Sequence, residues 1–314
     1  KRRHLKLRKG EFLLKKSKTM IVCFLTPALV FFVVVFLYPI CRTFAMSFFQ
    51  VTELSDPVSK WRFVGIDNFI KLLNTQIFQI SMTNIAKIWL FGGVLVLVTA
   101  MLFAVILTSG IKGKSFYRAV IYMPNIINAV AMASMWIHFV FNKRFGLLHS
   151  FFDMLGAEQL ALTDYMNGSI KFWALLAAYS FGSVGYYMLI FISGIERLPT
   201  DIFEAATIDG ANRFRQFTKI TLPLLRGVIR TCITFWTIGV VGFFVWSQMW
   251  TSPQASELSS ITPFVYMYTI TFGTQASTER AAGMGAAVGV VMTLVVHIAF
   301  FIINRLVKHD DLEF

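Results

Sequence analysis

The sequence predicts an all-α, polytopic membrane protein with six transmembrane helices, and three observations lead to this fold class. Of the 314 residues, 56% are hydrophobic and only 14% are charged, whereas soluble domains carry about 25% charged residues. Six stretches are each long and apolar enough to cross a bilayer as a helix, which takes about 20 residues. Lys and Arg are concentrated in alternate segments between these stretches, as in multi-pass proteins. This composition argues against a large soluble enzyme.

Each predicted span is a long apolar run bounded by charged or turn-forming residues. The first contains Pro27 and Pro39, and the third is interrupted at Pro124-Asn125. The six spans cover residues 20–41, 84–109, 117–141, 172–195, 228–250 and 281–305.

The distribution of cations predicts that both termini are cytoplasmic. With the N-terminus inside, 20 of the 29 Lys and Arg residues fall in inside segments. Nine of them lie within the first 18 residues, directly before the first span. We interpret this tail as a positive-inside anchor that contacts anionic membrane lipid. Nucleic acid is not expected as a partner, because no interleaved aromatic residues or nucleic-acid motif accompany the charge.

The spans divide the chain into five parts. A basic cytoplasmic tail precedes an extra first span, and an external loop with a short amphipathic helix follows. Asp67 is placed to cap that helix, and its Phe69, Leu72 and Leu73 would face the membrane surface. A five-helix core containing a polar central loop leads to a second cytoplasmic tail. In order, the parts are residues 1–19, 20–41, 42–82, 83–307 (with the central loop at 196–227) and 308–314.

The central loop, residues 196–227, has the most informative pattern in the chain. Thr200 or Asp201 can cap a short helix, and Gly210 permits the turn that ends it. A second short helix begins near Arg213 and is expected to end at Leu222-Pro223. Such a hairpin can fit a groove on another protein, although an amphipathic helix lying under the bilayer is the alternative interpretation.

The loop resembles the cytoplasmic coupling loop of ABC importer membrane subunits, with the pattern E-A-A-x3-G-x9-I-x-L-P. In that family a cytoplasmic ATPase moves the pore subunit through this loop. Glu204 would fix the loop by an ion pair or hydrogen bond, with Arg213 or Arg215 as its partner. The predicted ATPase-coupling residues are Glu204, Ala205, Ala206, Gly210, Ile220, Leu222 and Pro223.

Further patterns extend this resemblance over nearly the whole chain, to the first permease subunit of carbohydrate importers such as the maltose and glycerol-3-phosphate systems. They are Thr26-Pro27-Ala28, Tyr38-Pro39, Ser47-Phe48, Phe63-Val64-Gly65-Ile66-Asp67-Asn68-Phe69 and Arg118-x-x-Ile121-x-Met123-Pro124. The F-V-G-x-x-N-F pattern points to carbohydrate. The resemblance implies a type I ABC importer permease fold and a non-catalytic pore subunit in a bacterial cytoplasmic membrane. The expected substrate is an oligosaccharide.

The resemblance also implies partners and cofactors. The expected partners are a second permease subunit, two copies of an ATP-binding subunit and an extracytoplasmic solute-binding protein. This chain would carry no cofactor, because ATP and Mg would be bound by the ATPase subunits.

Substrate-pathway residues are expected in the fourth and fifth spans. Transporter sites lie near the bilayer midplane, where helices break or small residues open a cavity. Carried over from the maltose-type subunit, the positions are Phe181, Gly182, Ser183 and Tyr186 in the fourth span and Trp236, Gly239, Val240 and Phe243 in the fifth. Val240 and Phe243 stand where that family has Asn, so the sequence predicts an aromatic-lined passage. Helix packing is the alternative interpretation for each of these residues.

Two other functional classes have less support. An ion-coupled secondary transporter would need acids within the spans and inverted repeats. An intramembrane enzyme would need paired catalytic groups, but Lys87, His138 and His297 have no acidic partner within the spans. Within the importer class, glycerol phosphate esters remain an alternative substrate, although no Lys or Arg lies near the middle of a span.

Overall fold

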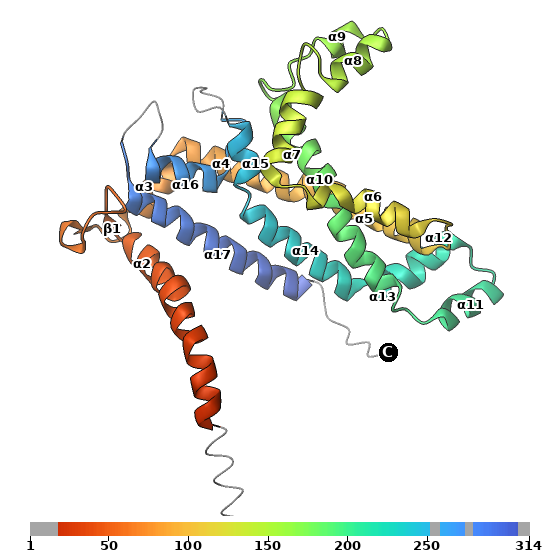
Figure 1. The fold of residues 1–314 in the computed structure, drawn as a ribbon, viewed down its shortest axis with the longest axis horizontal. Helices are drawn as coiled ribbons and strands as arrows, with labels where there is room; N and C mark the ends of the chain where they lie inside the picture. Colours follow the sequence, from red (N-terminus) through yellow and green to blue (C-terminus); the bar gives the residue numbers. More distant parts are fainter. Residues whose placement is uncertain (1–17, 252–257, 274–278, 307–314) are drawn as a thin grey trace, which may run out of the picture.

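The chain forms a bundle of helices with one small pair of strands, in a computed structural model that describes residues 18–251, 258–273 and 279–306. Nearly all of the predicted N-terminal tail and the whole predicted C-terminal tail lie outside these residues. Strands β1 (Phe49–Gln50) and β2 (Arg62–Phe63) pair antiparallel, with Phe49 opposite Phe63. The other elements of the described part are helical, which confirms the all-α fold class (Figure 1).

The helices follow one another with short connections. A first long helix covers Lys18–Met46 and ends in α2 (Tyr38–Met46). Short π-helical turns, labelled η3, η4 and η5, join some of the later helices. The later helices are α3 (Asp67–Asn74), α4 (Gln76–Lys87), η3 (Ile88–Gly92), α5 (Gly93–Thr108), α6 (Lys114–Ile126), α7 (Ala129–Met135), η4 (Trp136–Val140), α8 (Leu147–Met154), α9 (Glu158–Ala161), α10 (Ile170–Ile195), α11 (Thr200–Ile208), α12 (Arg213–Gln216), η5 (Phe217–Thr221), α13 (Leu222–Leu224), α14 (Arg226–Val241), α15 (Val245–Trp250), α16 (Pro263–Phe272) and α17 (Ala282–Leu306).

Six spans result if each of two bent helix pairs is counted as one span. Among the described residues, four unbent helices are long and apolar enough to cross a membrane: Lys18–Met46, Gln76–Thr108, Ile170–Ile195 and Ala282–Leu306. The first span runs beyond the predicted residue 41, and the second begins before the predicted residue 84. The external loop is therefore shorter than the predicted residues 42–82.

The third span is bent by 96° between α6 and the helix formed by α7 and η4. Pro124 stays inside α6, and the helix ends where Ile127 adopts an extended conformation, with ψ of 134°. The side chain of Asn128 then accepts a hydrogen bond from Val130 N–H at 2.9 Å, which satisfies one of the free donors at the start of α7. The bend lies just beyond the interruption that the sequence indicated, and it opens a corner beside α10.

The prediction of one uninterrupted fifth span over residues 228–250 is wrong. Helix α14 ends at Val241, and α15 begins at Val245. The hydroxyl of Thr262 donates to the Phe243 carbonyl at 2.8 Å, so this backbone acceptor in the break is satisfied inside the protein. At its other end, α14 meets the helix of residues Arg213–Leu224 at a bend of 68°.

Helix α10 lies at the centre of the largest core and packs along α5, α6 and α14. Gly185 lets α6 approach so closely that a Cβ at this position would lie 2.4 Å from the Ile121 carbonyl oxygen. Trp236 of α14 is buried and donates its indole N–H to the Trp89 carbonyl at 2.9 Å. A Cβ on Gly93 would lie 2.7 Å from that indole nitrogen. These close contacts hold α10 against α6, and α14 against η3 and α5.

A clasp, defined here as residues 47–69 and 279–286, joins the end of the first span to the start of α17. The buried side chain of Asn68 donates to the carbonyl oxygens of Ser47 and Phe49, both at 2.9 Å. Gly283 donates its N–H to Val51 O at 3.0 Å. A Cβ on Gly283 would lie 2.1 Å from Phe49 O, so only glycine fits there.

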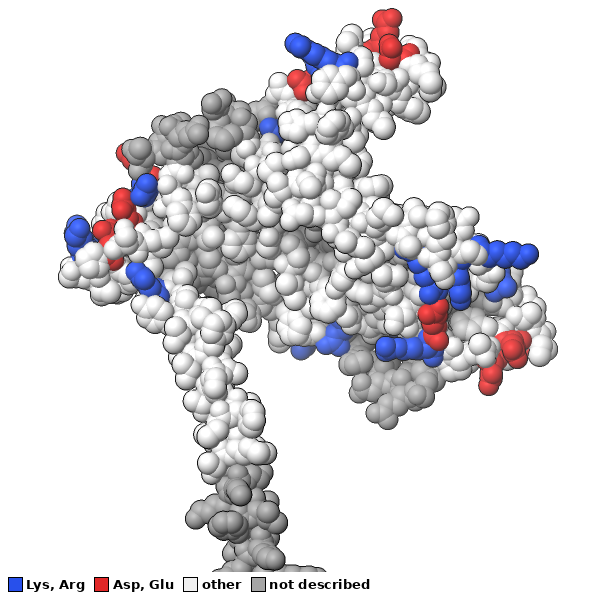
Figure 2. Space-filling model, in the orientation of Figure 1, with Lys and Arg blue, Asp and Glu red and all other residues white. Residues whose placement is uncertain are grey.

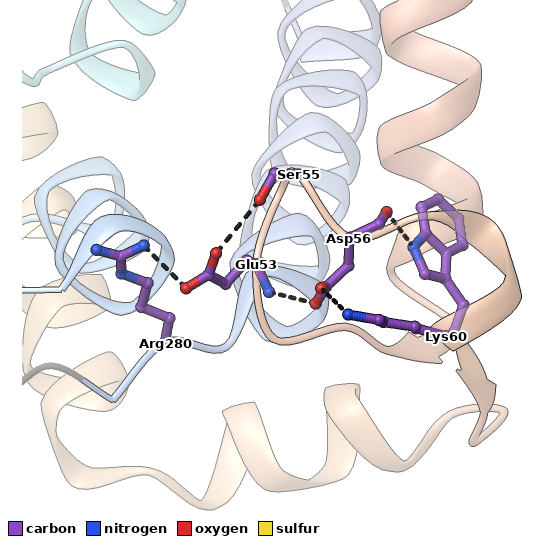
Figure 3. A network of polar contacts seen from close by, with 6 residues as sticks. Glu53, Ser55, Asp56, Lys60 and Arg280 are labelled. Atoms are coloured by element: carbon purple, nitrogen blue, oxygen red, sulfur yellow. Dashed lines mark hydrogen bonds and ion pairs between the residues drawn. The ribbon is translucent and has the colours of Figure 1, made fainter.

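Charged groups extend the clasp at its edge (Figure 3). Arg280 pairs with Glu53 at 3.1 Å, and Ser55 donates to the same carboxylate at 3.2 Å. Asp56 accepts from the Glu53 N–H at 2.9 Å and lies 3.9 Å from the Lys60 ammonium.

The short helix in the external segment packs differently from the prediction. Asp67 is the first residue of α3 and not its cap, which is Ile66. Leu72 is fully buried, and the Phe69 ring packs on Phe48 with centroids 5.5 Å apart. Of the three residues expected at the membrane surface, Leu73 is the one that is mostly exposed. The helix therefore packs against the protein, because its apolar side completes a core next to α17.

The first span stands apart from the rest of the bundle (Figure 1). Its most apolar window is 0% buried within the chain. Figure 2 shows charged side chains gathered at the ends of the bundle and an uncharged band between them, as expected for a bundle that spans a membrane.

Candidate functional site: the central loop and two cavities

The central loop folds into two short helices around a glycine turn. Gly210 has φ of +74°, a left-handed conformation that other residues rarely adopt. Asn212 caps α12 by accepting from Arg215 N–H at 2.8 Å. The buried Gln216 side chain donates to Thr207 Oγ1 and to the Ala211 carbonyl, both at 3.0 Å. Gln216, which the sequence pattern did not single out, therefore ties the second helix to the first.

The tip of this hairpin presents apolar side chains to the outside. Ile208 is 87% exposed and Phe214 is 74% exposed. Ala205 is exposed as well. Two large exposed apolar side chains close to a small one make a surface that suits a protein partner.

The structure does not support the predicted partners of Glu204. This carboxylate is exposed and has no hydrogen bond or ion pair with any residue in the described ranges. Arg213 and Arg215, the expected partners, are exposed too. Glu204 is thus available to a group outside this chain.

The ends of the two loop helices differ slightly from the prediction. The first loop helix begins at Thr200 with Pro199 in the capping position, so neither Thr200 nor Asp201 caps it. Leu222 and Pro223 lie in α13, the last turn of the second helix, which ends at Leu224, one residue beyond the predicted end. Ile220 is half-buried on this segment, which connects the hairpin to the membrane-spanning part.

An ion pair anchors the base of the central loop. Arg118 Nη2 of α6 lies 2.5 Å from Glu196 Oε1, directly after the last residue of α10. The Nε–H of Arg118 is buried and has no acceptor among the described residues. In the sequence, Arg118 stood out only as the first residue of a motif, and no role was predicted for Glu196.

A first cavity of about 300 Å³ lies in the corner made by the bent third span. We call it the tyrosine cavity. The structure brings three of the predicted pathway residues, Gly182, Ser183 and Tyr186, together here. Its complete lining is Pro124, Asn125, Ile127, Ala129, Met132, Tyr179, Gly182, Ser183, Tyr186, Tyr187 and Trp246.

Aromatic faces and a few polar groups make up this lining. The Tyr179 ring lies 5.8 Å from the Trp246 ring. Asn125 donates its side-chain N–H to Gly182 O at 3.3 Å, and Ser183 donates to Tyr179 O at 2.9 Å. The α6–α7 residues were not predicted to be part of the pathway, although the helix break at Pro124-Asn125 was a signal for them.

The other predicted pathway residues do not line this cavity. Trp236 and Val240 are 1% exposed and Phe243 is 4% exposed, so all three pack in the core. Phe181 is half-exposed and packs on Trp136, with ring centroids 5.5 Å apart. Gly239 is exposed, with no neighbour within 4 Å of a Cβ built on it. For the fifth-span aromatic residues, packing is the interpretation that the structure favours.

A second cavity of about 940 Å³ lies between the central-loop ends of α10, α14 and α17. We call it the arginine cavity, because Arg197 and Arg230 line it. Arg230 is held by hydrogen bonds from its guanidinium to the Asn304 side-chain oxygen. Tyr186 lines both cavities and so lies between them. In the described part of the chain, no group of three His, Cys, Asp or Glu side chains is placed to hold a metal ion.

Comparison with known proteins decides the class of this bundle. A family model described as a binding-protein-dependent transport system inner membrane component matches residues 96–309. The chain belongs to this family. The match includes the central loop and both cavities, so these features lie in the inner membrane component itself.

Several curated relatives resemble this inner membrane component over most of its length. The diacetylchitobiose uptake system permease protein NgcF of Streptomyces coelicolor is 29% identical, over 92% of this chain and 83% of its own length. The arabinooligosaccharides transport system permease protein AraP of Bacillus subtilis is 28% identical, over 90% and 87%. The sn-glycerol-3-phosphate transport system permease protein UgpA of Escherichia coli is 28% identical, over 68% and 70%.

A solved structure has the same fold. A chain of a bacterial ABC transporter involved in the import of the acidic polysaccharide alginate superposes with a TM-score of 0.77. The match covers 93% of this chain and 98% of the other, at 18% identity. A second alginate transporter structure, in complex with a periplasmic protein bound to alginate pentasaccharide, gives a TM-score of 0.76. The inner membrane component thus has the fold of an ABC importer permease.

Proposed function

We propose that this chain is a pore-forming subunit of an ATP-driven importer that receives a carbohydrate, an oligosaccharide, from an extracytoplasmic binding protein. The observation that carries the proposal is the family match together with a self-braced loop whose apolar tip is exposed. Relatives named for diacetylchitobiose and arabinooligosaccharides support the substrate class.

The central loop is the proposed docking element for a cytoplasmic ATPase. Ile208 and Phe214 would enter a groove on the ATPase, and the unpaired Glu204 would meet a donor there. Ala205 and Ala206 allow close approach, while Gly210 sets the turn between the two helices. Ile220, Leu222 and Pro223 would pass the movement on to α14. ATP and Mg would be bound by the ATPase subunits, and this chain would catalyse no reaction.

We propose that the tyrosine cavity forms part of the substrate pathway. Aromatic rings pack on the C–H faces of sugar rings, and the Asn125 and Ser183 side chains can exchange hydrogen bonds with hydroxyl groups. Gly182, Ser183 and Tyr186 remain pathway candidates. Phe181 and Gly239 lie outside the cavity and would meet substrate only in another conformation.

The proposed assembly contains a second permease subunit, two ATP-binding subunits and the binding protein. Both termini and the central loop would face the cytoplasm, as the distribution of cations predicts. The exposed first span would contact membrane lipid or the second permease subunit.

Glycerol phosphate esters are the second candidate substrate class. UgpA is named for sn-glycerol-3-phosphate transport, and two arginines line the larger cavity. The tyrosine cavity, however, has no charged side chain in its lining. Purified binding protein that takes up glycerol phosphate esters but no saccharide would favour this candidate.

The test is purification of the complex from its native membrane in mild detergent, followed by mass spectrometry. We expect a second permease and an ATPase with a phosphate-binding loop to copurify. Glu204→Ala should weaken ATPase binding by about ten- to a hundredfold, and so reduce the amount recovered, since a charge-assisted contact at an interface is worth about 1.5–3 kcal/mol. Glu158→Ala on α9, also exposed but far from the loop, is the matched control. Recovery of the chain without an ATPase in several gentle detergents would contradict the proposal.

A further inference from the structure

We propose that Arg118 and Glu196 join α6 and α10 into one rigid unit, which carries movement of the central loop to the tyrosine cavity. The inference rests on the proposed function of the central loop, and it assigns a positioning role to two residues outside the loop's motif. Three observations along the α6–α10 contact support it.

The first observation is the ion pair itself. Glu196 begins the central loop, and Arg118 belongs to a different span, 78 residues earlier. The two charged atoms are 2.5 Å apart, and the Arg118 side chain is 23% exposed. Because the Nε–H of Arg118 is buried without an acceptor, the guanidinium depends on Glu196 for its compensation. The Glu196 side chain is 46% exposed, so solvent screens part of this attraction.

The second observation is the close packing of the two helices further along. At Gly185 the backbones of α6 and α10 approach so closely that a Cβ would also lie 2.7 Å from Tyr122 Cα. Close-packed helices with no side chain between them slide or separate only at the expense of many contacts. Asn125 adds a hydrogen bond from α6 to the Gly182 carbonyl of α10. The two helices are therefore joined at three levels.

The third observation is the position of the tyrosine cavity. Its walls include Pro124, Asn125 and Ile127 at the end of α6 and Gly182, Ser183 and Tyr186 of α10. From Gly182 to Glu196, α10 rises about 20 Å. A displacement of the loop at Glu196 would move the α6 and α10 sides of the cavity together. Helix α7, which lies beyond the 96° bend, would not move with them. The cavity would then change its width with the state of the ATPase.

The experiment compares charge reversals in the reconstituted complex with its binding protein, ATPase and saccharide. The measured quantity is the ratio of saccharide imported to ATP hydrolysed. Arg118→Glu and Glu196→Arg should each lower this ratio by about five- to tenfold, which corresponds to a typical coupling between two sites. The reciprocal double variant restores an ion pair and should recover most of the ratio.

The matched control is the ion pair at the other end of the molecule. Arg280 and Glu53 also join distant segments, with N–O of 3.1 Å, but they lie in the clasp and not between loop and cavity. Reversing either charge should leave the ratio of import to hydrolysis unchanged. A fall equal to that of the Arg118 variant would overturn the proposal, because any lost ion pair would then have the same effect.

Glu196→Gln is a milder variant that tests the proposal even if charge reversal prevents assembly of the complex. The amide keeps the shape of the side chain but loses the charge, so the complex should assemble while the ratio falls. An assembled Glu196→Gln complex with a normal ratio overturns the inference. Absence of ATP-driven saccharide import by the unaltered complex would instead overturn the proposed function, so the two failures are distinguishable.

Discussion

At the scale of single residues, chemistry that looks alike in the sequence has different roles in the structure. Tyr186 and Trp236 are both aromatic residues in predicted spans. Tyr186 lines two cavities, whereas Trp236 is 1% exposed and donates its N–H to a backbone carbonyl. The difference comes from Gly92 and Gly93, which leave the space that the Trp236 indole fills. A residue's type thus indicates what it can do, and its neighbours decide what it does.

Tyr186→Ala should change transport more than it changes assembly. The side chain lies between the two cavities, so its loss widens the passage and leaves the core intact. We expect uptake rates to change several-fold while the amount of purified complex stays the same, and Tyr186→Phe should behave like the unaltered protein in assembly. Loss of complex formation in Tyr186→Ala would instead identify a packing residue.

Gly210 should tolerate asparagine better than alanine. A Cβ at this position would meet nothing within 4 Å, so backbone conformation alone decides the outcome. Alanine in the left-handed region costs about 1–2 kcal/mol, and asparagine costs less because it adopts this region more readily. ATPase binding should therefore decrease for Gly210→Ala and remain close to normal for Gly210→Asn, measured by copurification. Equal loss in both variants would show that the turn has no such requirement.

At the scale of elements, the sequence predicted the spans, the loop and the interruption of the third span, but not the break in the fifth span. Hydropathy locates apolar runs, and four of the runs became unbent helices. The break in the fifth span involves a tertiary partner, since Thr262 donates a hydrogen bond to Phe243 O across 19 residues. The tyrosine cavity lies at the break in the third span, and the apolar pattern did not show that five residues around this break would line it. The fifth-span pathway residues were carried over from the maltose-type subunit, but in this structure Trp236, Val240 and Phe243 pack in the core.

The F-V-G-x-x-N-F pattern has a structural role in the clasp. Asn68 is the only asparagine in it and makes two donor contacts to backbone carbonyls. Asn68→Asp should strongly destabilise the protein, since a buried carboxylate would face two acceptors and each lost hydrogen bond costs about 1–3 kcal/mol. The measurement is the melting temperature in detergent. Asp67→Asn, at a half-buried neighbour with no such contacts to β1, is the control, and a similar melting temperature for both variants would refute this role.

At the scale of the whole molecule, the two ends of the helix bundle have different structures. One end presents the exposed central loop, and the other is fastened by the clasp. Helix α10 begins near α7, ends at the central loop and packs against three other spans. The α8–α9 hairpin projects away from the bundle (Figure 1). The long first span lies outside the residues that the family model matches, 96–309.

The clasp has a consequence for how the chain is made. Arg280 and Glu53 are 227 residues apart, so the first span leaves the ribosome long before its partner, α17, exists. Since the most apolar window of that span is not buried by any described residue, we expect it to enter the bilayer as an independent helix before α17 is made. Contacts between such distant segments form late and slowly. The clasp closes only when synthesis is nearly complete, and a chain that stops before α17 leaves its first helix without a fixed position.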